Sequence, residues 1–321
     1  MTYSSGGLIE ATDYNGFVST TSGANVNTVW GTGATDSGWG QTALSTVSAA
    51  GTVTATQWAS LVNTITSMGA QTNTTITSRT APTTGSTIAI LAALNTDLTN
   101  ITTNRQNAVA NGTQFTGWTG TNSKTGATSG ATWTITFTNT ITWASADAAR
   151  YFFNAGGRIK IDVSKTATGA TGDPEWNDLA NTLCGDIYIT GGTATQTIAG
   201  TAYTGTTKIG GTGSPNTLAT TTGWYDLTAG AAATIVYKQF ADTAPYTNNF
   251  IQHSIAKGAS SNTLVITTLW SASDGDPISG GTAPTGATPG TAPTTIVTYF
   301  PPSTTYLTDT WGTPTVAATT A

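Results

Sequence analysis

Apolar residues alternate with threonine between Trp133 and Trp143, and this pattern constrains the fold more than any other feature of the sequence. Side chains along a β-strand point alternately to the two faces of the sheet, so a period of two is typical of a half-buried strand. Further strands are expected at Arg158–Val163, Asp186–Ile189, Thr234–Phe240, Asn249–Ala256, Asn262–Leu269 and Thr294–Phe300. We therefore predict a mainly β chain, with an antiparallel β-sandwich-like, Thr/Gly-rich domain over residues 113–321.

The composition agrees with this prediction and adds a second one. Charged residues make up only 8% of the chain, against about 25% in a typical soluble domain, while threonine fills nearly a quarter of it. Intrinsic disorder does not explain these values, because disordered chains have few aromatic residues and this chain has 10 Trp, 10 Tyr and 8 Phe. Threonine is β-branched and suits a pleated surface. Since so few charges leave uncharged surface available for packing against neighbours, we expect a subunit of a large assembly.

Several classes of protein are disfavoured by the sequence. A net charge of −5 argues against nucleic-acid binding, which needs clustered Lys and Arg. The chain contains no run of about 18 apolar residues, so no membrane insertion is expected. Residues 1–7 lack the basic and apolar segments of a secretory signal peptide, which predicts synthesis in a cytoplasm without standard export. The single cysteine, Cys184, excludes an internal disulfide.

Residues 1–50 are expected to form an N-terminal attachment arm, in which glycines are mixed with isolated aromatic residues. The segment Leu8–Val18 can form one or two helical turns, with Thr12 or Asp13 as the cap. The segment Asn27–Gly40 is too rich in glycine for a helix and is predicted to be an ordered loop. Such an arm packs on a neighbouring subunit, which we favour, or lies on its own domain.

Residues 51–112 are predicted to form a short helical hairpin for oligomerisation. Thr54 or Thr56 can cap the first helix, which Gly69 ends or weakens and which carries one apolar face formed by Trp58, Leu61, Val62 and Ile65. After a break at Pro82–Gly85, Ser86 can cap a second helix with the seam Leu91, Leu94, Leu98 and Ile101. Because this seam covers only about two heptads, we favour a hairpin packed within or between subunits over a free-standing coiled coil.

One further helix is expected inside the β domain. Asp173 can cap it and Pro174 fits its first position, while Trp176, Leu179 and Leu183 share one face. We expect this helix to lie across the sandwich. The run Gly280–Pro293, rich in Gly, Pro and Thr, is predicted to be a loop.

The residues that could carry chemistry are few. The sole histidine, His253, falls in a predicted strand, and no Gly-x-Ser-x-Gly elbow accompanies it, so a surface or core role is favoured over a catalytic triad. One His and one Cys serve zinc poorly, and Cys184 is expected to be a small buried hydrophobe. The segment Gly210–Gly213 lacks the lysine of a phosphate-binding loop and is expected to be an ordinary loop.

Carboxylates and exposed aromatic rings were the remaining candidates. The only glutamates are Glu10 and Glu175, and the acidic residues Asp173, Glu175 and Asp178 gather at a helix start, where the helix dipole already favours them. A turn is sufficient to explain Asp274 and Asp276, although such a pair can bind calcium. Rings that could stack on sugars, but that we expect in a core or interface, are Trp118, Trp224, Tyr225 and Trp270. We therefore predict no catalytic, cofactor or metal site and no enzymatic activity.

One motif resembles a known family. The sequence Ala149-Arg-Tyr-Phe-Phe-Asn-Ala-Gly-Gly-Arg-Ile-Lys-Ile161, followed by Glu175-Trp-Asn-Asp-Leu179, resembles a motif of virion structural proteins from tailed bacteriophages, especially cyanophages and related myophages. The segments Gly7–Asn15, Val29–Gly33 and Gln57–Leu61 are similar to the opening of these proteins. The resemblance covers roughly residues 7–190, and the rest of the chain is similar only in composition.

The motif also predicts local structure. Gly156 and Gly157 allow a turn with positive φ that leads into a strand, and three aromatic residues, Tyr151, Phe152 and Phe153, can fill a core beside it. Arg150 can anchor an acidic helix start such as Glu175. The resemblance implies that these residues support the fold of one subunit.

The resemblance implies a non-enzymatic structural component of a virion, best interpreted as a fibre-like protein of the tail or neck. The arm and helices would attach and oligomerise it, while the β domain would project or bridge. The implied partners are other copies of the chain, with a trimer as the commonest arrangement in fibres, and other virion proteins. Two alternatives remain open, a receptor-binding tip that recognises a host surface glycan and a head decoration or collar protein.

Overall fold

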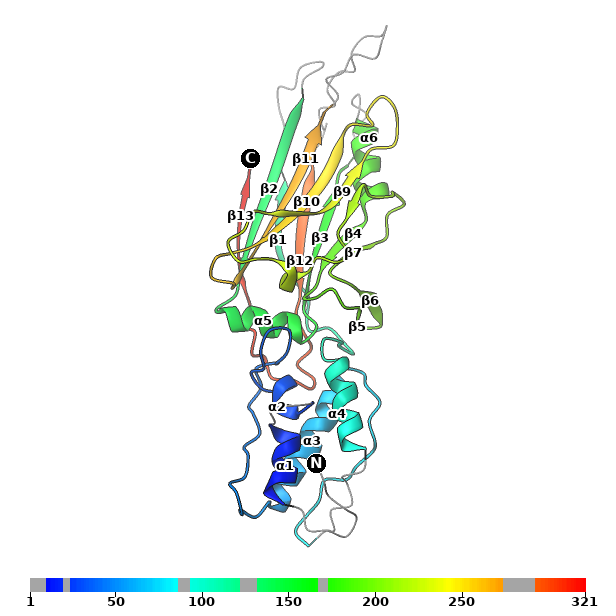
Figure 1. Ribbon diagram of the computed structural model, residues 1–321. Coiled ribbons are helices and arrows are strands. Elements are labelled where there is room, and N and C mark those ends of the chain that lie inside the picture. Colours follow the sequence, from blue (N-terminus) through cyan, green and yellow to red (C-terminus); the bar gives the residue numbers. More distant parts are fainter. Residues whose placement is uncertain (1–9, 20–23, 86–92, 122–131, 167–172, 274–291) are drawn as a thin grey trace.

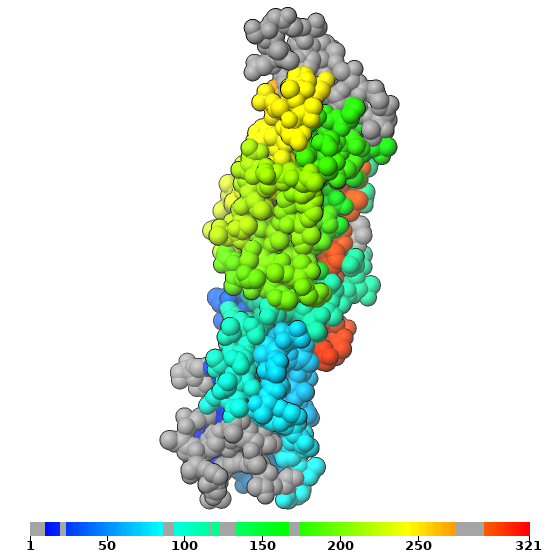
Figure 2. Space-filling model, turned by 90° about the vertical axis from the view of Figure 1, so that its right-hand side faces the viewer, coloured from blue at the N-terminus to red at the C-terminus, as the bar shows by residue number. Residues whose placement is uncertain are grey.

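Two antiparallel sheets packed together make up most of the molecule, and a lobe of helices continues it at one end (Figure 1). The computed structural model describes residues 10–19, 24–85, 93–121, 132–166, 173–273 and 292–321. The body is elongated, with the helical lobe and the sandwich arranged end to end, as a second view also shows (Figure 2). Within these ranges no helix has the length and apolar character needed to cross a membrane.

The larger sheet has six strands in the order β13-β2-β11-β10-β9-β8. Its centre is a long pairing of β2 (Trp133–Thr142) with β11 (Thr263–Ala272), in which Trp133 lies opposite Ala272 and Thr142 opposite Thr263. The remaining strands are β8 (Thr217–Leu218), β9 (Thr234–Phe240), β10 (Phe250–Lys257) and β13 (Thr315–Thr320).

The smaller sheet has five strands in the order β1-β12-β3-β4-β7. These strands are β1 (Phe115–Thr121), β3 (Arg158–Ser164), β4 (Asp186–Ile189), β7 (Thr206–Ile209) and β12 (Thr294–Phe300). A separate hairpin of β5 (Gln196–Ile198) and β6 (Thr201–Tyr203) lies near the helical lobe (Figure 1). The predicted antiparallel sandwich is confirmed.

The alternation in β2 directs apolar side chains into the space between the sheets. Ile135, Phe137 and Ile141 are fully buried, while the threonines between them lie on the outer face. The expected strands β4, β9 and β12 have the predicted bounds, and β3, β10 and β11 differ from their predictions only at the ends. The strands β1 and β13 were not predicted, because two glycines interrupt the pattern of the first and the second contains a single large apolar residue.

The helical lobe contains α1 (Ala11–Val18), α2 (Val26–Val29), α3 (Ala55–Gln71) and α4 (Leu94–Thr103). The hydroxyl of Thr54 accepts a hydrogen bond from the Gln57 N–H and the Gln57 side chain accepts one in return, so the predicted cap of α3 is confirmed. The apolar face is also confirmed, with Trp58 buried edge-on against the rings of Tyr14 and Phe17. The helix continues past Gly69 to Gln71.

The second helix of the predicted hairpin is α4, and it packs against α3 within the same chain. The three seam residues that the structure describes, Leu94, Leu98 and Ile101, are fully buried. The predicted cap Ser86 and the seam residue Leu91 lie outside the described residues.

Two expectations about the first fifty residues differ from the structure. Glu10, rather than Thr12 or Asp13, occupies the N-cap position of α1, where its backbone N–H donates to the Asp13 carboxylate (3.1 Å). The predicted loop Asn27–Gly40 overlaps the short helix α2, which Asn25 caps by accepting a hydrogen bond from the Thr28 N–H.

Residues 24–50 pack on their own chain. Side-chain amides hold them there by pairing with backbone N–H and C=O groups. Asn15 exchanges two such bonds with Val47 (2.7 and 2.8 Å), and Asn27 exchanges two with Leu44 (2.8 and 2.9 Å). An amide side chain has the same donor and acceptor groups as a peptide bond, so each pair reproduces the two hydrogen bonds that a residue pair exchanges in an antiparallel sheet.

Two helices belong to the β domain. One is α5 (Ala146–Asn154), which the sequence did not reveal as a helix. The other is α6 (Asp173–Asp178), continued by the π-helical turns η1 (Leu179–Cys184), and it was predicted. Its apolar face of Trp176, Leu179 and Leu183 is buried as expected. The helix begins at Asp173, which was predicted to precede it as the cap. Of the predicted loop Gly280–Pro293, residues 280–291 lie outside the described ranges.

Asn139 occupies a core position of β2 that the alternation reserves for an apolar side chain. It is fully buried, and neither polar atom of its side chain has a hydrogen-bond partner in the described structure. Since an unsatisfied buried polar group costs about 1–3 kcal/mol, we predict that Asn139→Val raises the free energy of unfolding by about 1–2 kcal/mol. Urea denaturation measures this, with Thr138→Val on the outer face as the control. A lower stability of Asn139→Val would show that the amide has a partner.

Candidate functional site

Helix α5 lies where the helical lobe meets the end of the sandwich (Figure 1), and it contains most of the motif that carries the family resemblance. We call the contacts of α5 with the sandwich core and with residues 30–41 the junction. The side chain of Ser145 accepts a hydrogen bond from the Ala148 N–H and thereby starts the helix. The turn after the helix uses Gly156 with φ +95°, which confirms the predicted positive φ there.

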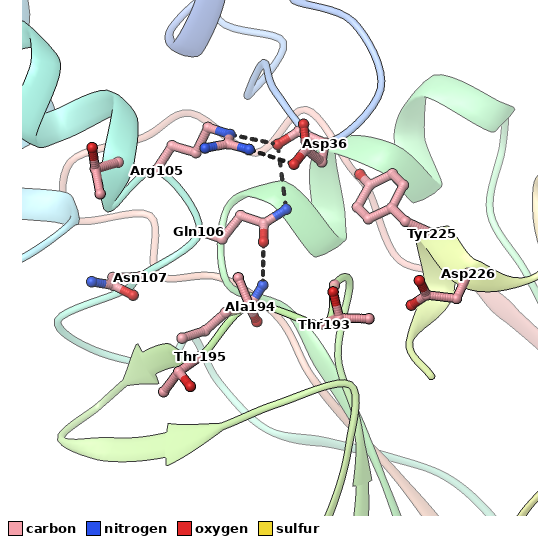
Figure 3. Close-up of a pocket in the computed structure, with 12 residues that line it drawn as sticks. Asp36, Arg105, Gln106, Asn107, Thr193, Ala194, Thr195, Tyr225 and Asp226 are labelled. Atoms are coloured by element: carbon pink, nitrogen blue, oxygen red, sulfur yellow. Dashed lines mark hydrogen bonds and ion pairs between the residues drawn. The ribbon is translucent and has the colours of Figure 1, made fainter. Parts of the chain in front are cut away.

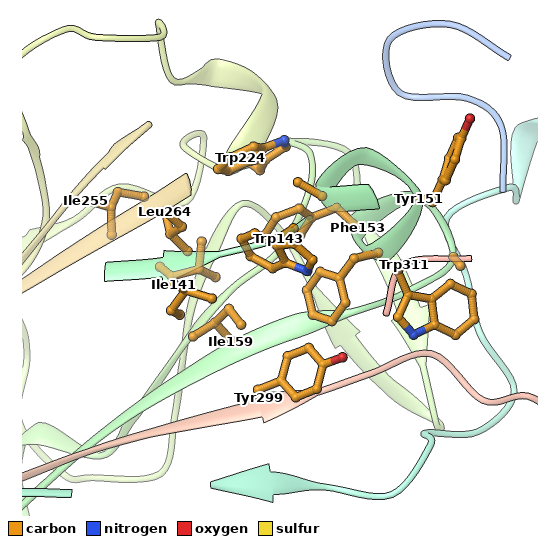
Figure 4. Packing of buried hydrophobic residues seen from close by; sticks show 14 of the residues in the cluster. Ile141, Trp143, Tyr151, Phe153, Ile159, Trp224, Ile255, Leu264, Tyr299 and Trp311 are labelled. Carbon is orange, nitrogen blue, oxygen red and sulfur yellow. The ribbon is translucent and has the colours of Figure 1, made fainter. Parts of the chain in front are cut away.

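The side of α5 that faces the sandwich consists of aromatic rings. Phe152 stacks on Tyr299 with ring centroids 5.1 Å apart, and Phe153 stacks on Trp224 at the same distance. Trp143, at the end of β2, contacts both phenylalanines at 5.2 and 5.6 Å (Figure 4). All five rings are buried, so the expectation that the motif aromatics fill a core is confirmed.

The other side of α5 holds the helical lobe through backbone carbonyls. Arg150 pairs with Asp147 (2.9 Å) and donates hydrogen bonds to the carbonyl oxygens of Ser37 (2.6 Å) and Thr32 (2.7 Å). The expectation that Arg150 anchors Glu175 was therefore wrong. Helix α6, which carries Glu175, lies at the opposite end of the sandwich from α5 (Figure 1).

Asn154, the last residue of α5, connects three parts of the chain. Its Nδ2 atom donates to the carbonyl of Gly38 (3.0 Å), and its Oδ1 atom accepts from the hydroxyl of Tyr225. Its backbone carbonyl accepts from Nε1 of Trp39 (3.0 Å), which also donates to the carbonyl of Arg105 (3.1 Å). Because Asn154 and Trp39 are almost completely buried, these bonds are shielded from water and fix the two lobes against each other.

A small polar cavity of about 160 Å³ opens beside the junction (Figure 3). Its polar groups are mostly paired with one another. Arg105 forms an ion pair with Asp36, and Gln106 donates to the Asp36 carbonyl while accepting a hydrogen bond from Gln196. The phenol of Tyr225 lines the same cavity, and burial raises its pKa well above the usual value. The paired groups of this cavity support the junction.

His253 and Cys184 lie in the core of the sandwich on either side of Tyr237. The Nδ1 atom of His253 is 3.0 Å from the Thr268 hydroxyl, and the ring stacks on Tyr237 at 5.3 Å. Burial lowers the pKa of His253 to about 3, so the imidazole is neutral at physiological pH. Cys184 is buried as expected, and burial raises its pKa to about 12, which suppresses thiolate chemistry.

The other candidates are distributed over the molecule. Glu10 occupies the N-cap position of α1, and the loop from Gly210 to Gly213 connects β7 with β8, as expected of a plain loop. Trp224 and Trp270 are buried in the core, which confirms the packing interpretation for both, while Trp118 and Tyr225 are partly buried. Asp274 and Asp276 lie outside the described residues. Glu175 and Asp178 do come together, and a third carboxylate joins them.

The sequence did not single out Trp39, Asn154 or Tyr225 as partners in one network. For Asn154 a signal existed, since it follows the aromatic residues of the motif directly, but Trp39 and Tyr225 come from distant segments without a pattern. In comparisons with known proteins, no family model, no characterised protein and no solved structure matches this chain.

The first prediction for the junction concerns Asn154. Asn154→Leu removes the bonds to the buried Gly38 and the partly buried Tyr225, so we expect the free energy of unfolding to fall by about 2–4 kcal/mol. Amide hydrogen exchange should also accelerate in residues 32–41. Asn100→Leu, at an exposed position of α4, is the matched control. Unchanged exchange in residues 32–41 would contradict the role given to Asn154.

A second prediction follows from the depressed pKa of His253. Between pH 6.5 and about 3 the unfolded chain binds a proton at this position and the folded chain does not. Folding stability therefore decreases as the pH falls through this window, by at most about 1.4 kcal/mol per pH unit. Urea denaturation at a series of pH values should show a shallower decrease for His253→Phe than for the wild type. Equal slopes would mean that His253 is protonated in the folded core.

Proposed function

We propose that this chain is a non-enzymatic structural protein of a tailed-bacteriophage virion, a fibre-like component of the tail or neck. The observation that carries the proposal is the junction. The motif that resembles virion proteins, from Arg150 to Gly157, is the element that joins two lobes end to end in one elongated body. Residues at this position hold the two lobes in a fixed orientation and can transmit force from one lobe to the other. A fibre-like subunit requires both.

The two lobes suit different tasks in such a subunit. The helical lobe, with the N-terminal segment packed on it, is the part that attaches to the virion, and the sandwich projects from it. Synthesis in the host cytoplasm and assembly into the particle follow from this role.

The edge of the sandwich supports self-association. Strands β1 and β13 are the outer strands of the two sheets and lie side by side, with Gly117 in contact with Val316. Neither strand contains a charged residue. Proteins that remain monomeric commonly protect such edges with charges or proline. An uncharged pair of edges therefore supports a homo-oligomer, and we propose a trimer.

The oligomer can be tested in solution. We predict a trimeric mass by light scattering coupled to size-exclusion chromatography, and a shift toward monomer in Ala317→Lys, because the substitution places a charge on the exposed side of β13. Ala232→Lys, at an exposed position outside this edge, is the control that should remain trimeric. A monomeric wild type would contradict the oligomer.

The location can be tested on particles. Virions from cells infected with the phage that encodes this chain should contain it by mass spectrometry, and immunogold labelling should mark the tail or neck. Labelling over the whole head would favour the decoration protein instead. Absence of the chain from purified particles would overturn the proposed function.

A further inference from the structure

Three carboxylates meet at the end of the sandwich farthest from the helical lobe. Glu175 and Asp178 come from α6, and Asp242 comes from the connection between β9 and β10. Each contributes an oxygen, and these oxygens all lie within 4.8 Å of one another. The helix dipole explains an acidic residue such as Glu175 in a first turn, but it does not explain Asp178 at the last position of α6 or Asp242 on another segment.

Glu175 points to a missing ligand by a separate observation. Its side chain is only 7% exposed, and its Oε1 atom is buried without a hydrogen-bond partner in the described structure. The Thr243 hydroxyl beside it donates its hydrogen bond to Oδ1 of Asp242 (3.2 Å). A buried anion is stable when a cation or hydrogen bonds compensate its charge.

No ion pair in the described part of the chain supplies that compensation. Among the residues that the structure describes, no Lys or Arg side chain forms an ion pair with any of the three carboxylates. The acidic residues that do form ion pairs are Asp36, Asp97, Asp147, Asp162 and Asp186. Three negative charges therefore share a small volume. Asp242 is exposed and Asp178 is half-buried, so the cluster is open to solvent on one side.

We propose that Glu175, Asp178 and Asp242 bind a calcium ion. The donors are all hard oxygens, which suit Ca²⁺ and disfavour metals that prefer nitrogen or sulfur. Ligands at about 2.4 Å from one ion lie no more than about 4.8 Å apart, so three oxygens within 4.8 Å of one another can bind the same calcium ion. Water can complete the six to eight ligands on the open side.

The ion has a structural task at this position. Helix α6 lies on the connection from β3 to β4 in the smaller sheet, whereas Asp242 follows β9 of the larger sheet. Calcium bound to both therefore joins the two sheets at the end that α5 does not close. This role does not depend on the proposed place in a virion, because it concerns the fold of a single chain.

The test compares calcium binding in the full chain and in Asp242→Asn, with both proteins first treated with EDTA and dialysed into 0.15 M NaCl. Calorimetric titration with CaCl₂ should show one site in the wild type and binding weakened at least about tenfold in Asp242→Asn. At a calcium concentration about 100 times the dissociation constant, the wild-type melting temperature should rise by roughly 5 °C. Asp147→Asn, which removes one acidic charge near α5, is the matched control and should bind like the wild type.

Two results would overturn the proposal. One is the absence of calcium binding to the wild type, and the other is equal binding by the wild type and Asp242→Asn. Magnesium at the same concentration should give a smaller shift, because it demands a tighter octahedral site, and an equal shift with both ions in all three proteins would indicate only screening. Circular dichroism in EDTA checks that each variant folds; if Asp242→Asn does not, Asp178→Asn decides the question.

Discussion

The stacking of Phe152 on Tyr299 and of Phe153 on Trp224 is the interaction on which the rest of the structure depends. A two-sheet sandwich has open ends, and these rings close the end that faces the helical lobe (Figure 4). Once α5 is fixed in this way, its opposite side presents Arg150 and Asn154 to the carbonyls of residues 32–38. Core packing of the sandwich and placement of the helical lobe are thus two consequences of one nine-residue helix.

The scarcity of charge determines how the parts are held together. Where other proteins use ion pairs, this chain pairs side-chain amides with backbone groups, as Asn15 does with Val47 and Gln41 does with Thr308. Such bonds between neutral groups are insensitive to salt, whereas exposed ion pairs are screened. The same scarcity leaves the three carboxylates of Glu175, Asp178 and Asp242 without a basic partner in the described structure, and the proposed calcium ion would supply that positive charge.

The sequence predicted the elements in which apolar residues recur at a fixed spacing. The alternation of β2 and the apolar face of α3 each repeat often enough to define a strand and a helix, and the Thr54–Gln57 cap is a local pair. Helix α5 was missed because the run Tyr151 to Asn154 is buried throughout, so the stripe of Ala148, Ala149, Phe152 and Phe153 does not stand out in the sequence. The junction and the carboxylate cluster could not be predicted, since Trp39 and Asn154, or Glu175 and Asp242, are brought together only by the packing of distant segments.

The central claim is that the junction makes the two lobes one rigid body. The most direct test is the distance distribution between spin labels at Thr99→Cys on α4 and Thr247→Cys at the far end of the sandwich, measured by double electron–electron resonance. Both positions are exposed, and the buried thiol of Cys184 does not compete for the label. The account predicts a single narrow distribution. A broad distribution, or several separate distances, would contradict it by showing that the lobes move independently.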